Sequence, residues 1–254
     1  MPALFISNTS HLFSLKVNQS ATKKIDEFTS MPAPKALMRI AYSGATTTAS
    51  VITEGFKNDN LAMKESKRNL MHLDDSIVES FEISKTLMAT FMAHGLQITS
   101  YHDAKLDPEV IDVLASLLHH QAIPIVQLSV IKNATPAHYY LLGQVLANLR
   151  SKGVLIIGWG SLTRYSPLTN EGNRVPDWII EFEIWMQEKI LSNNIYNLIN
   201  YQQEAPFARF NQLCEDELMP LFVIMGVMGN FAKSKLVYLK NKSNNQLLDG
   251  FIFS

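Results

Sequence analysis

Short apolar runs that alternate with longer amphipathic segments constrain the fold of this chain most strongly. Residues 3–6, 36–42, 123–129 and 154–157 are short runs dominated by aliphatic side chains, and polar or glycine residues bound them. Runs of this length are typical of strands buried on both faces of a sheet. Because helical segments separate most of these runs, the order predicts an α/β fold with a central, mostly parallel sheet and helices on both faces.

Helix signals occupy the segments between the strands. Thr135 and Pro136 are residue types preferred at an N-cap and at the first helical position, and Gly95 is placed like a C-terminal helix stop. We expect helices at residues 18–28, 77–94, 108–120, 135–150, 178–191 and 217–228. Further strands are expected at residues 46–52, 96–99, 235–239 and 247–253, with the last two forming an antiparallel C-terminal pair.

The stretch from Glu54 to Asp75 departs from this pattern because it is polar and has no clear period. Its basic residues are Lys57, Lys64, Lys67 and Arg68, and acidic residues stand among them. Mixed charge of this kind is typical of a solvated loop or lid rather than a binding patch. The chain has no repeat, low-complexity tract or linker, so we expect a single domain over residues 1–254.

Charge and hydropathy exclude several function classes. The chain has 22 Lys and Arg against 23 Asp and Glu, a formal charge of −1, which lacks the basic footprint of a nucleic-acid binder. Its longest apolar stretches, residues 153–159 and 218–228, fall short of the roughly 20 residues needed to cross a bilayer. Residues 1–6 lack the basic start of a secretory leader. We therefore expect a cytoplasmic protein without nucleic-acid or membrane partners.

Cysteine usage points to a reducing compartment. The chain has one cysteine, Cys214, which excludes an intrachain disulfide and a multi-thiolate zinc site. No neighbouring histidine or cation is placed by sequence to lower the pKa of this thiol, so we expect an inert side chain. Histidines are therefore the remaining strong metal ligands available.

Several segments together carry a resemblance that extends over nearly the whole chain. They are the opening residues 1–7, the strand Ile123-Pro124-Ile125-Val126-Gln127-Leu128-Ser129, the segment 153–162, the pair Pro220-Leu221 and the end Asp249-Gly250-Phe251-Ile252-Phe253. In order and spacing these segments resemble the class III extradiol ring-cleavage dioxygenases, in particular the branch of the 4,5-DOPA dioxygenases. The resemblance implies the α/β fold predicted above.

The resemblance also implies a metal site, but this chain departs from it at each position. Family members hold non-haem Fe(II), or zinc in some, with two histidines and a third histidine or glutamate. Asn8 stands at the first ligand position and Ser43 at the second. Pro108 replaces a histidine near the metal, and Arg164 replaces the usual histidine base. The ligand set of the family is therefore not preserved.

Two further histidine positions of the family lie near the C-terminus. Gln212 and Glu217 stand there in this chain. Glu217 is compatible with a carboxylate ligand, but Asn8 and Ser43 are neutral oxygen donors and cannot replace two imidazoles. Arg164 would repel a divalent ion. We expect neither a metal nor another cofactor.

None of the seven histidines of the chain falls on a functional position of the family. They are His11, His72, His94, His102, His119, His120 and His138. Ordinary surface or turn positions account for them, and the adjacent pair in the helix predicted at residues 108–120 would point in different directions. A histidine-based site is therefore not expected.

The substituted positions are polar and would form a hydrogen-bonding set. Asn8, Ser43, Gln212 and Arg164 are the candidate ligand-binding residues. In a metal-free reaction Arg164 would clamp a carboxylate or enolate, and Glu217 with tyrosine would move protons. The candidate tyrosines are Tyr42 and Tyr165. Alternatively, Arg164 and Glu217 pair with each other and only fill the space left by the ion.

Three functions stay open from these residues. The first is a catalytically silent protein that binds a small aromatic or carboxylate metabolite, or assembles as a homodimer or with a pathway enzyme. The second is a metal-independent tautomerase, cyclase or hydrolase of a specialised pathway, acting through Arg164, Glu217 and the two tyrosines. The third, and least favoured, is a residual dioxygenase. Whether the chain is an enzyme is left open at this point.

Overall fold

A computed structural model describes much of the chain. The described residues are 1–7, 33–42, 50–54, 73–102, 110, 113–114, 117–118, 123–163, 175–230, 232–240 and 247–254, with backbone only at 53–54, 73–81, 101–102, 212–215, 238–240 and 247. Strands are β1 (Ala3–Ser7), β2 (Ala36–Ala41), β3 (Ser50–Glu54), β4 (Ile98–His102), β5 (Ile125–Ser129), β6 (Val154–Gly160), β7 (Ser234–Lys240) and β8 (Leu247–Phe253). Helices are α2 (Leu73–Ala93), α4 (Pro136–Ser151), α5 (Asp177–Leu191), α6 (Ile195–Ile199), α7 (Tyr201–Glu204), the 3₁₀ helix η5 (Ala208–Cys214) and α8 (Glu215–Met228).

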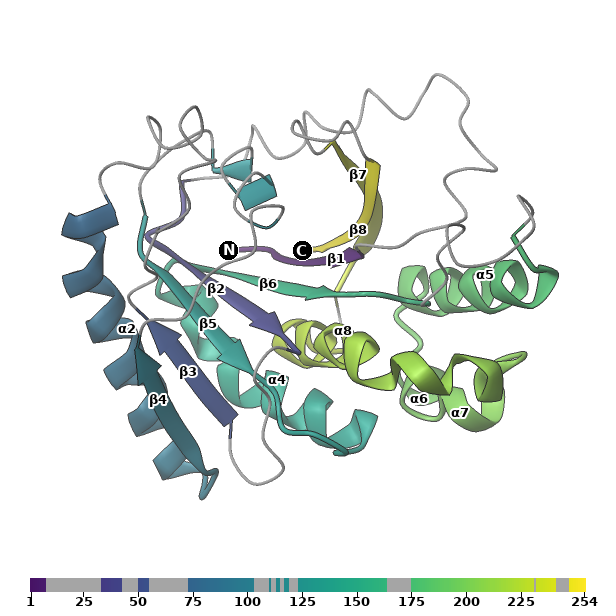
Figure 1. Cartoon of the computed structure of the whole chain (residues 1–254), viewed down its shortest axis with the longest axis horizontal. Helices are drawn as coiled ribbons and strands as arrows, with labels where there is room; N and C mark the ends of the chain where they lie inside the picture. Colours follow the sequence, from purple (N-terminus) through teal and green to yellow (C-terminus); the bar gives the residue numbers. More distant parts are fainter. Residues whose placement is uncertain are drawn as a thin grey trace.

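The strands form one sheet in the order β4-β3-β5-β2-β6-β1-β8-β7 (Figure 1). At its centre β5, β2, β6 and β1 run parallel to one another. β8 pairs antiparallel with both β1 and β7, which confirms the predicted C-terminal pair. β3 runs antiparallel to β5 and carries β4 parallel beside it. The predicted α/β fold with a mostly parallel sheet is therefore confirmed, with a reversed pair at one edge.

Alternate side chains of the central strands supply two apolar cores. Phe5, Met38 and Ile156 face the core that α2, α4, α5 and α8 cover. Leu37 and Ile157 face the opposite core, which includes residues 110, 113, 114 and 118. Because successive strand side chains point to opposite faces, strands covered on both sides are apolar at most positions. This is the physical reason for the continuous apolar runs in the sequence.

Glycines let α8 approach both the sheet and α4 closely. A Cβ atom at Gly158 would lie 2.7 Å from Ile224 Cγ1, and one at Gly160 would overlap the carbonyl oxygen of Glu217. At the crossing of α4 and α8, a Cβ atom at Gly226 would overlap the carbonyl oxygen of Tyr140. Gly158 and Gly160 therefore let α8 pack against the end of β6, and Gly226 lets it pack against α4.

Several predicted boundaries need correction. Glu54 is the last residue of β3 and Asp75 lies in α2, so the predicted loop from Glu54 to Asp75 is wrong at both ends. Residues 55–72 lie outside the described part, as does the helix predicted at residues 18–28. Of the strand predicted at residues 46–52, the described residues 50–52 form the start of β3.

The helices near residues 195–214 were not predicted. The segments α6, α7 and η5 are short and carry few of the spacings that identify a long amphipathic helix, so periodicity does not detect them. Among the helices that the structure describes, none is long and apolar enough to span a bilayer.

Candidate functional site

The carboxyl ends of four parallel strands meet at one edge of the sheet. β5, β2, β6 and β1 are neighbours and run in the same direction, as their arrowheads show in Figure 1. Tyr42 directly follows β2, Ser161 directly follows β6, and Lys132 lies in the segment after β5. This edge is where ligands bind most often in open α/β sheets, so we describe it as the candidate site.

The segment after β6 is held by elements distant in the sequence. The Ser161 amide donates to the carbonyl oxygen of Glu217 at the start of α8 over 3.0 Å. The Leu162 amide donates to Ser7 Oγ, the last residue of β1, over 3.4 Å. Ser161 Oγ donates to the carbonyl oxygen of Thr163. The backbone is therefore fixed up to the residue before Arg164.

Two buried polar side chains anchor the same segment from the helical side. Thr163 Oγ1 donates to Glu183 Oε1 of α5 over 2.6 Å, and Glu183 is fully buried. Asn211 Nδ2 of η5 donates to the carbonyl oxygen of Leu162 over 2.8 Å. Asn211 Oδ1 is also buried and has no hydrogen-bond partner among the described residues. Thr163 and Asn211 therefore hold this segment against α5 and η5.

A second polar group lies across the ends of β2 and β5. The ammonium of Lys132 is 5.6 Å from the ring centroid of Tyr42. The hydrogen bond to Tyr42 is the main cause that raises the pKa of Lys132, and the charge of Asp216 adds to it. Lys132 is exposed, whereas Tyr42 and Asp216 are half-buried. The edge therefore presents a phenol, an ammonium and a carboxylate close together.

Tyr139 forms the buried wall behind this group. Its hydroxyl donates to the carbonyl oxygen of Ile131, and its side chain is fully buried. Burial raises the pKa of Tyr139 to about 12, with a smaller contribution from the negative charge of Asp216. This tyrosine therefore stays protonated under physiological conditions and serves as a structural hydrogen-bond donor.

A cavity of about 350 Å³ opens beside Asp216. Its lining residues are Asn133, Ala134, Thr135, Pro136, Gln202, Asp216 and Met219. They come from the loop after β5, the start of α4, α7 and α8, so the cavity lies at the same edge as Tyr42 and Lys132. Its volume is within the range of small-molecule sites, about 300–1,000 Å³.

Comparison with known families decides the identity of the fold. The family of the catalytic LigB subunit of aromatic ring-opening dioxygenases matches residues 8–248. The chain belongs to this family. The resemblance inferred from the sequence motifs is therefore confirmed.

Proteins similar to this LigB-family chain differ in how much of it they match. The chain is 38% identical over 120 residues to "4,5-DOPA dioxygenase extradiol" of Beta vulgaris and 34% identical over 117 residues to that of Mirabilis jalapa. Each alignment covers 46% of this chain and 44% of the relative. The crystal structure of an uncharacterized Escherichia coli K12 protein covers 100% of both chains with a TM-score of 0.65 at 16% identity, which shows the fold alone.

The structure describes two of the predicted site residues of this LigB-family chain fully. Tyr42 and Glu217 both lie at the carboxyl edge, Tyr42 after β2 and Glu217 against Gly160 at the end of β6. Both are half-buried. Asn8, Ser43, Arg164 and Tyr165 lie outside the described residues, and Gln212 is described by its backbone within η5. The predicted pairing of Arg164 with Glu217 is therefore untested.

Sequence reasoning missed Lys132, Asp216 and Glu183. Lys132 lies shortly after β5, one of the central parallel strands. Because that strand was predicted, its carboxyl end could have indicated Lys132 as a site residue. Glu183 lies four residues after buried Ile179 and three before buried Met186, on the inward face of α5. A charged residue at an inward helical position indicates a buried partner, so this spacing could have identified it.

The donor set that the sequence resemblance assigns to the family's metal positions does not fit non-haem iron or zinc. It comprises the amide of Asn8, the hydroxyl of Ser43 and the carboxylate of Glu217, whereas these metals prefer imidazole nitrogen in such sites. The structure describes the side chains of His94 and His138. His94 directly follows α2, and its Nδ1 lies 2.8 Å from the carbonyl oxygen of Thr90. His138 lies in α4 and is half-buried. In the described residues no three His, Cys, Asp or Glu side chains cluster as metal ligands would.

Proposed function

We propose that this LigB-family chain binds a small oxygenated metabolite, aromatic or carboxylate, at the carboxyl edge of its sheet and does not cleave catechol rings. The observation that carries this proposal is the juxtaposition of Tyr42, Lys132 and Asp216 beside a cavity of about 350 Å³. Convergent polar groups next to a cavity are typical of small-molecule sites.

The charges of this group favour an anionic or phenolic ligand. Because contact with Tyr42 raises the pKa of Lys132, the ammonium stays charged and is available to a carboxylate or phenolate. Asp216 lines the cavity and would accept a hydrogen bond from a hydroxyl or amino group of the same ligand. A ligand with both an acidic group and hydroxyl donors therefore suits the site.

The residues at the family's metal positions support the negative half of the proposal. Asn8, Ser43 and Glu217 comprise two neutral oxygen donors and one carboxylate, which do not make an iron or zinc centre of the family type. The relatives carry the name of a DOPA dioxygenase, but the aligned part is 44% of their length. Their activity is therefore not transferred to this chain.

A metal-independent enzyme is the second candidate. The specific observation in its favour is the ammonium of Lys132 5.6 Å from the ring centroid of Tyr42, which places a hydroxyl donor and a cation side by side at this edge. Glu217, whose backbone is fixed by Ser161, would accept the proton, while Arg164 clamps the substrate and Tyr165 assists. In this case the bound metabolite would be tautomerised, cyclised or hydrolysed. Assembly with a second copy or a pathway enzyme remains a separate proposal.

The test combines metal analysis, binding and turnover on the purified full chain. DOPA is titrated calorimetrically and incubated aerobically with added Fe(II). We expect binding without ring-opened product, and a loss of about tenfold in affinity in Lys132→Gln, the size expected for one charge-assisted hydrogen bond. The control is Lys233→Gln, an exposed lysine next to β7 that should leave binding unchanged. Stoichiometric iron or zinc together with ring-opened product would show a dioxygenase instead.

The same preparation separates binding from metal-independent turnover. Pathway intermediates are incubated with the wild type and with Arg164→Ala, and product formation is followed chromatographically. Turnover that is lost in Arg164→Ala supports the enzyme. Binding without turnover supports the silent ligand-binding protein, and the absence of binding to every aromatic or carboxylate probe contradicts both.

A further inference from the structure

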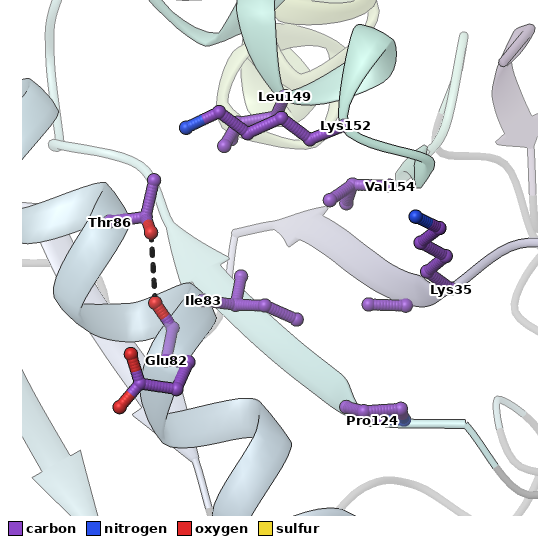
Figure 2. Close-up of a pocket in the computed structure, with 9 residues that line it drawn as sticks. Lys35, Glu82, Ile83, Thr86, Pro124, Leu149, Lys152 and Val154 are labelled. Atoms are coloured by element: carbon purple, nitrogen blue, oxygen red, sulfur yellow. Dashed lines mark hydrogen bonds between the residues drawn. The ribbon is translucent and has the colours of Figure 1, made fainter.

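A second cavity lies at the opposite end of the parallel strands. It has a volume of about 530 Å³ and lies between α2 and the end of α4 (Figure 2). Ala36 and Val154, the first residues of β2 and β6, line it together with Pro124, which precedes β5. This is the amino edge of the sheet, so the cavity is separate from the candidate site at the carboxyl edge.

The interior of this amino-edge cavity is aliphatic. Ile83 of α2 and Leu149 of α4 complete the apolar lining, and among the described residues no aromatic ring contributes to it. Figure 2 shows Ile83, Leu149 and Val154 around the same space. Backbone groups beside the cavity pair with each other: the amide of Leu37 donates to the carbonyl oxygen of Pro124 over 2.9 Å, and that of Lys35 to the carbonyl oxygen of Gly153 over 3.0 Å. The interior therefore suits a hydrocarbon chain better than a ring that needs stacking or polar contacts.

The rim of the cavity is basic. The ammonium groups of Lys35 and Lys152 lie on different sides of it in Figure 2, and both side chains are exposed. The carboxylate at the rim, Glu82, already forms an ion pair with Lys85 over 3.1 Å. Within the described part of the chain no carboxylate pairs with Lys35 or Lys152, so a net positive charge faces the opening.

The remaining polar groups of the rim are used internally. Thr86 Oγ1 donates to the carbonyl oxygen of Glu82 over 2.9 Å. At the end of α4 the carbonyl oxygens of Leu149 and Arg150 accept the amides of Lys152 and Gly153 over 3.1 and 3.0 Å. The two lysines are therefore the hydrogen-bond donors that the described rim offers to a ligand, and ammonium donors select an anion.

We propose that the amino-edge cavity binds a medium-chain aliphatic carboxylate, with its hydrocarbon chain against Ile83, Leu149 and Val154 and its carboxylate at the basic rim that carries Lys35 and Lys152. The occupant follows from charge complementarity at the rim and from the aliphatic interior. The site is independent of the carboxyl-edge function because the two lie at opposite ends of the strands.

The test is calorimetric titration of the full chain with decanoate, decanol and decylammonium, which share one tail and differ in the head group. We expect one decanoate per chain, with decanol and decylammonium binding at least about tenfold more weakly, since the charge-assisted contact is lost or reversed. The double variant Lys35→Gln/Lys152→Gln should lose about the same factor for decanoate and none for decanol. Lys233→Gln is the matched control, with unchanged affinity expected.

Filling the interior provides the second arm. Ile83→Trp should abolish binding of decanoate and decanol alike while leaving the far-ultraviolet circular dichroism spectrum of the chain intact. Equal affinity for all three head groups, unchanged decanoate binding in the double lysine variant, or several decanoate molecules per chain would overturn the proposal. DOPA binding at the carboxyl edge should be the same in the double lysine variant as in the wild type, so the two sites are tested separately.

Discussion

At the scale of single residues, the buried phenol of Tyr139, beside the candidate site, makes the free energy of unfolding depend on pH. Its pKa is raised to about 12 by burial, whereas in the unfolded chain it titrates near 10. Between these values the unfolded state loses the proton and the folded state keeps it, so stability falls as the pH rises through this window. Below about pH 10 the group contributes no pH dependence.

Replacing this phenol should remove that alkaline loss. In the wild type we expect the titration of Tyr139 to cost about 2 kcal/mol of unfolding free energy between about pH 10 and 12, and Tyr139→Phe should lack this component. Urea denaturation at a series of pH values measures it. Tyr196→Phe, at an exposed position, is the control and should behave as the wild type. Identical alkaline slopes for wild type and Tyr139→Phe would contradict the buried-phenol assignment.

The pKa of Lys132 offers a ranking test of the same site. Tyr42 is the main cause that raises this pKa and Asp216 is a smaller one, so Tyr42→Phe should lower the pKa of Lys132 more than Asp216→Asn does. Nuclear magnetic resonance of ¹³C-labelled lysine ε-carbons follows the titration directly. A larger shift in Asp216→Asn would show that the carboxylate, not the phenol, controls the ammonium.

At the scale of helices, the start of α4 depends on one cap. Thr135 Oγ1 accepts the amide of His138 over 3.2 Å, and Pro136 occupies the first turn. Thr135→Ala should cost about 1 kcal/mol of unfolding free energy, whereas Thr135→Ser retains the acceptor and should be close to neutral. Chemical denaturation of the two variants checks this expectation, and an equal loss in both would show that the methyl group of Thr135, not its hydroxyl, stabilises the helix.

The crossing of α4 and α8 should be more sensitive than the cap. A methyl group at Gly226 would overlap the carbonyl oxygen of Tyr140, and backbone cannot move aside as a side chain can. We expect Gly226→Ala to cost up to about 3 kcal/mol, and thermal unfolding measures it.

Gly95→Ala is the matched control for this crossing. Its added methyl group meets nothing within 4 Å, but its φ of +67° is unfavourable for alanine, so a loss of about 1 kcal/mol is expected. A loss no greater in Gly226→Ala than in Gly95→Ala would mean that the two helices separate easily.

At the scale of the whole molecule, protection should follow position in the sheet. β1, β2 and β6 are covered on both faces and their described side chains are buried, whereas β4 and β7 are edge strands. Hydrogen exchange should therefore be slowest at the amides of β1, β2 and β6 and faster at β4 and β7. Mass spectrometry of peptic fragments checks this order, and uniform protection across the sheet would contradict it.

How much the sequence predicted differs between the elements and the site. Local sequence features predicted the strands β1, β2, β5 and β6 and the helix α4. Each strand is a continuous apolar run, and the helix begins with its own capping residues. Tyr42 and Glu217 were predicted at the site through the family resemblance and lie at the expected edge. Lys132 and Asp216 were missed because they are 84 residues apart by their numbers and meet only through the packing of α8.

The sequence by itself determined the α/β class and the family, because these depend on residue type and local order. Only the tertiary structure decided that β3 runs antiparallel to β5, that Glu183 is a buried anchor of the segment before Arg164, and that an aliphatic cavity opens at the amino edge. Strand direction and cavities arise from contacts between segments that are distant in the chain. Such contacts produce no periodic pattern in the local sequence from which they could be predicted.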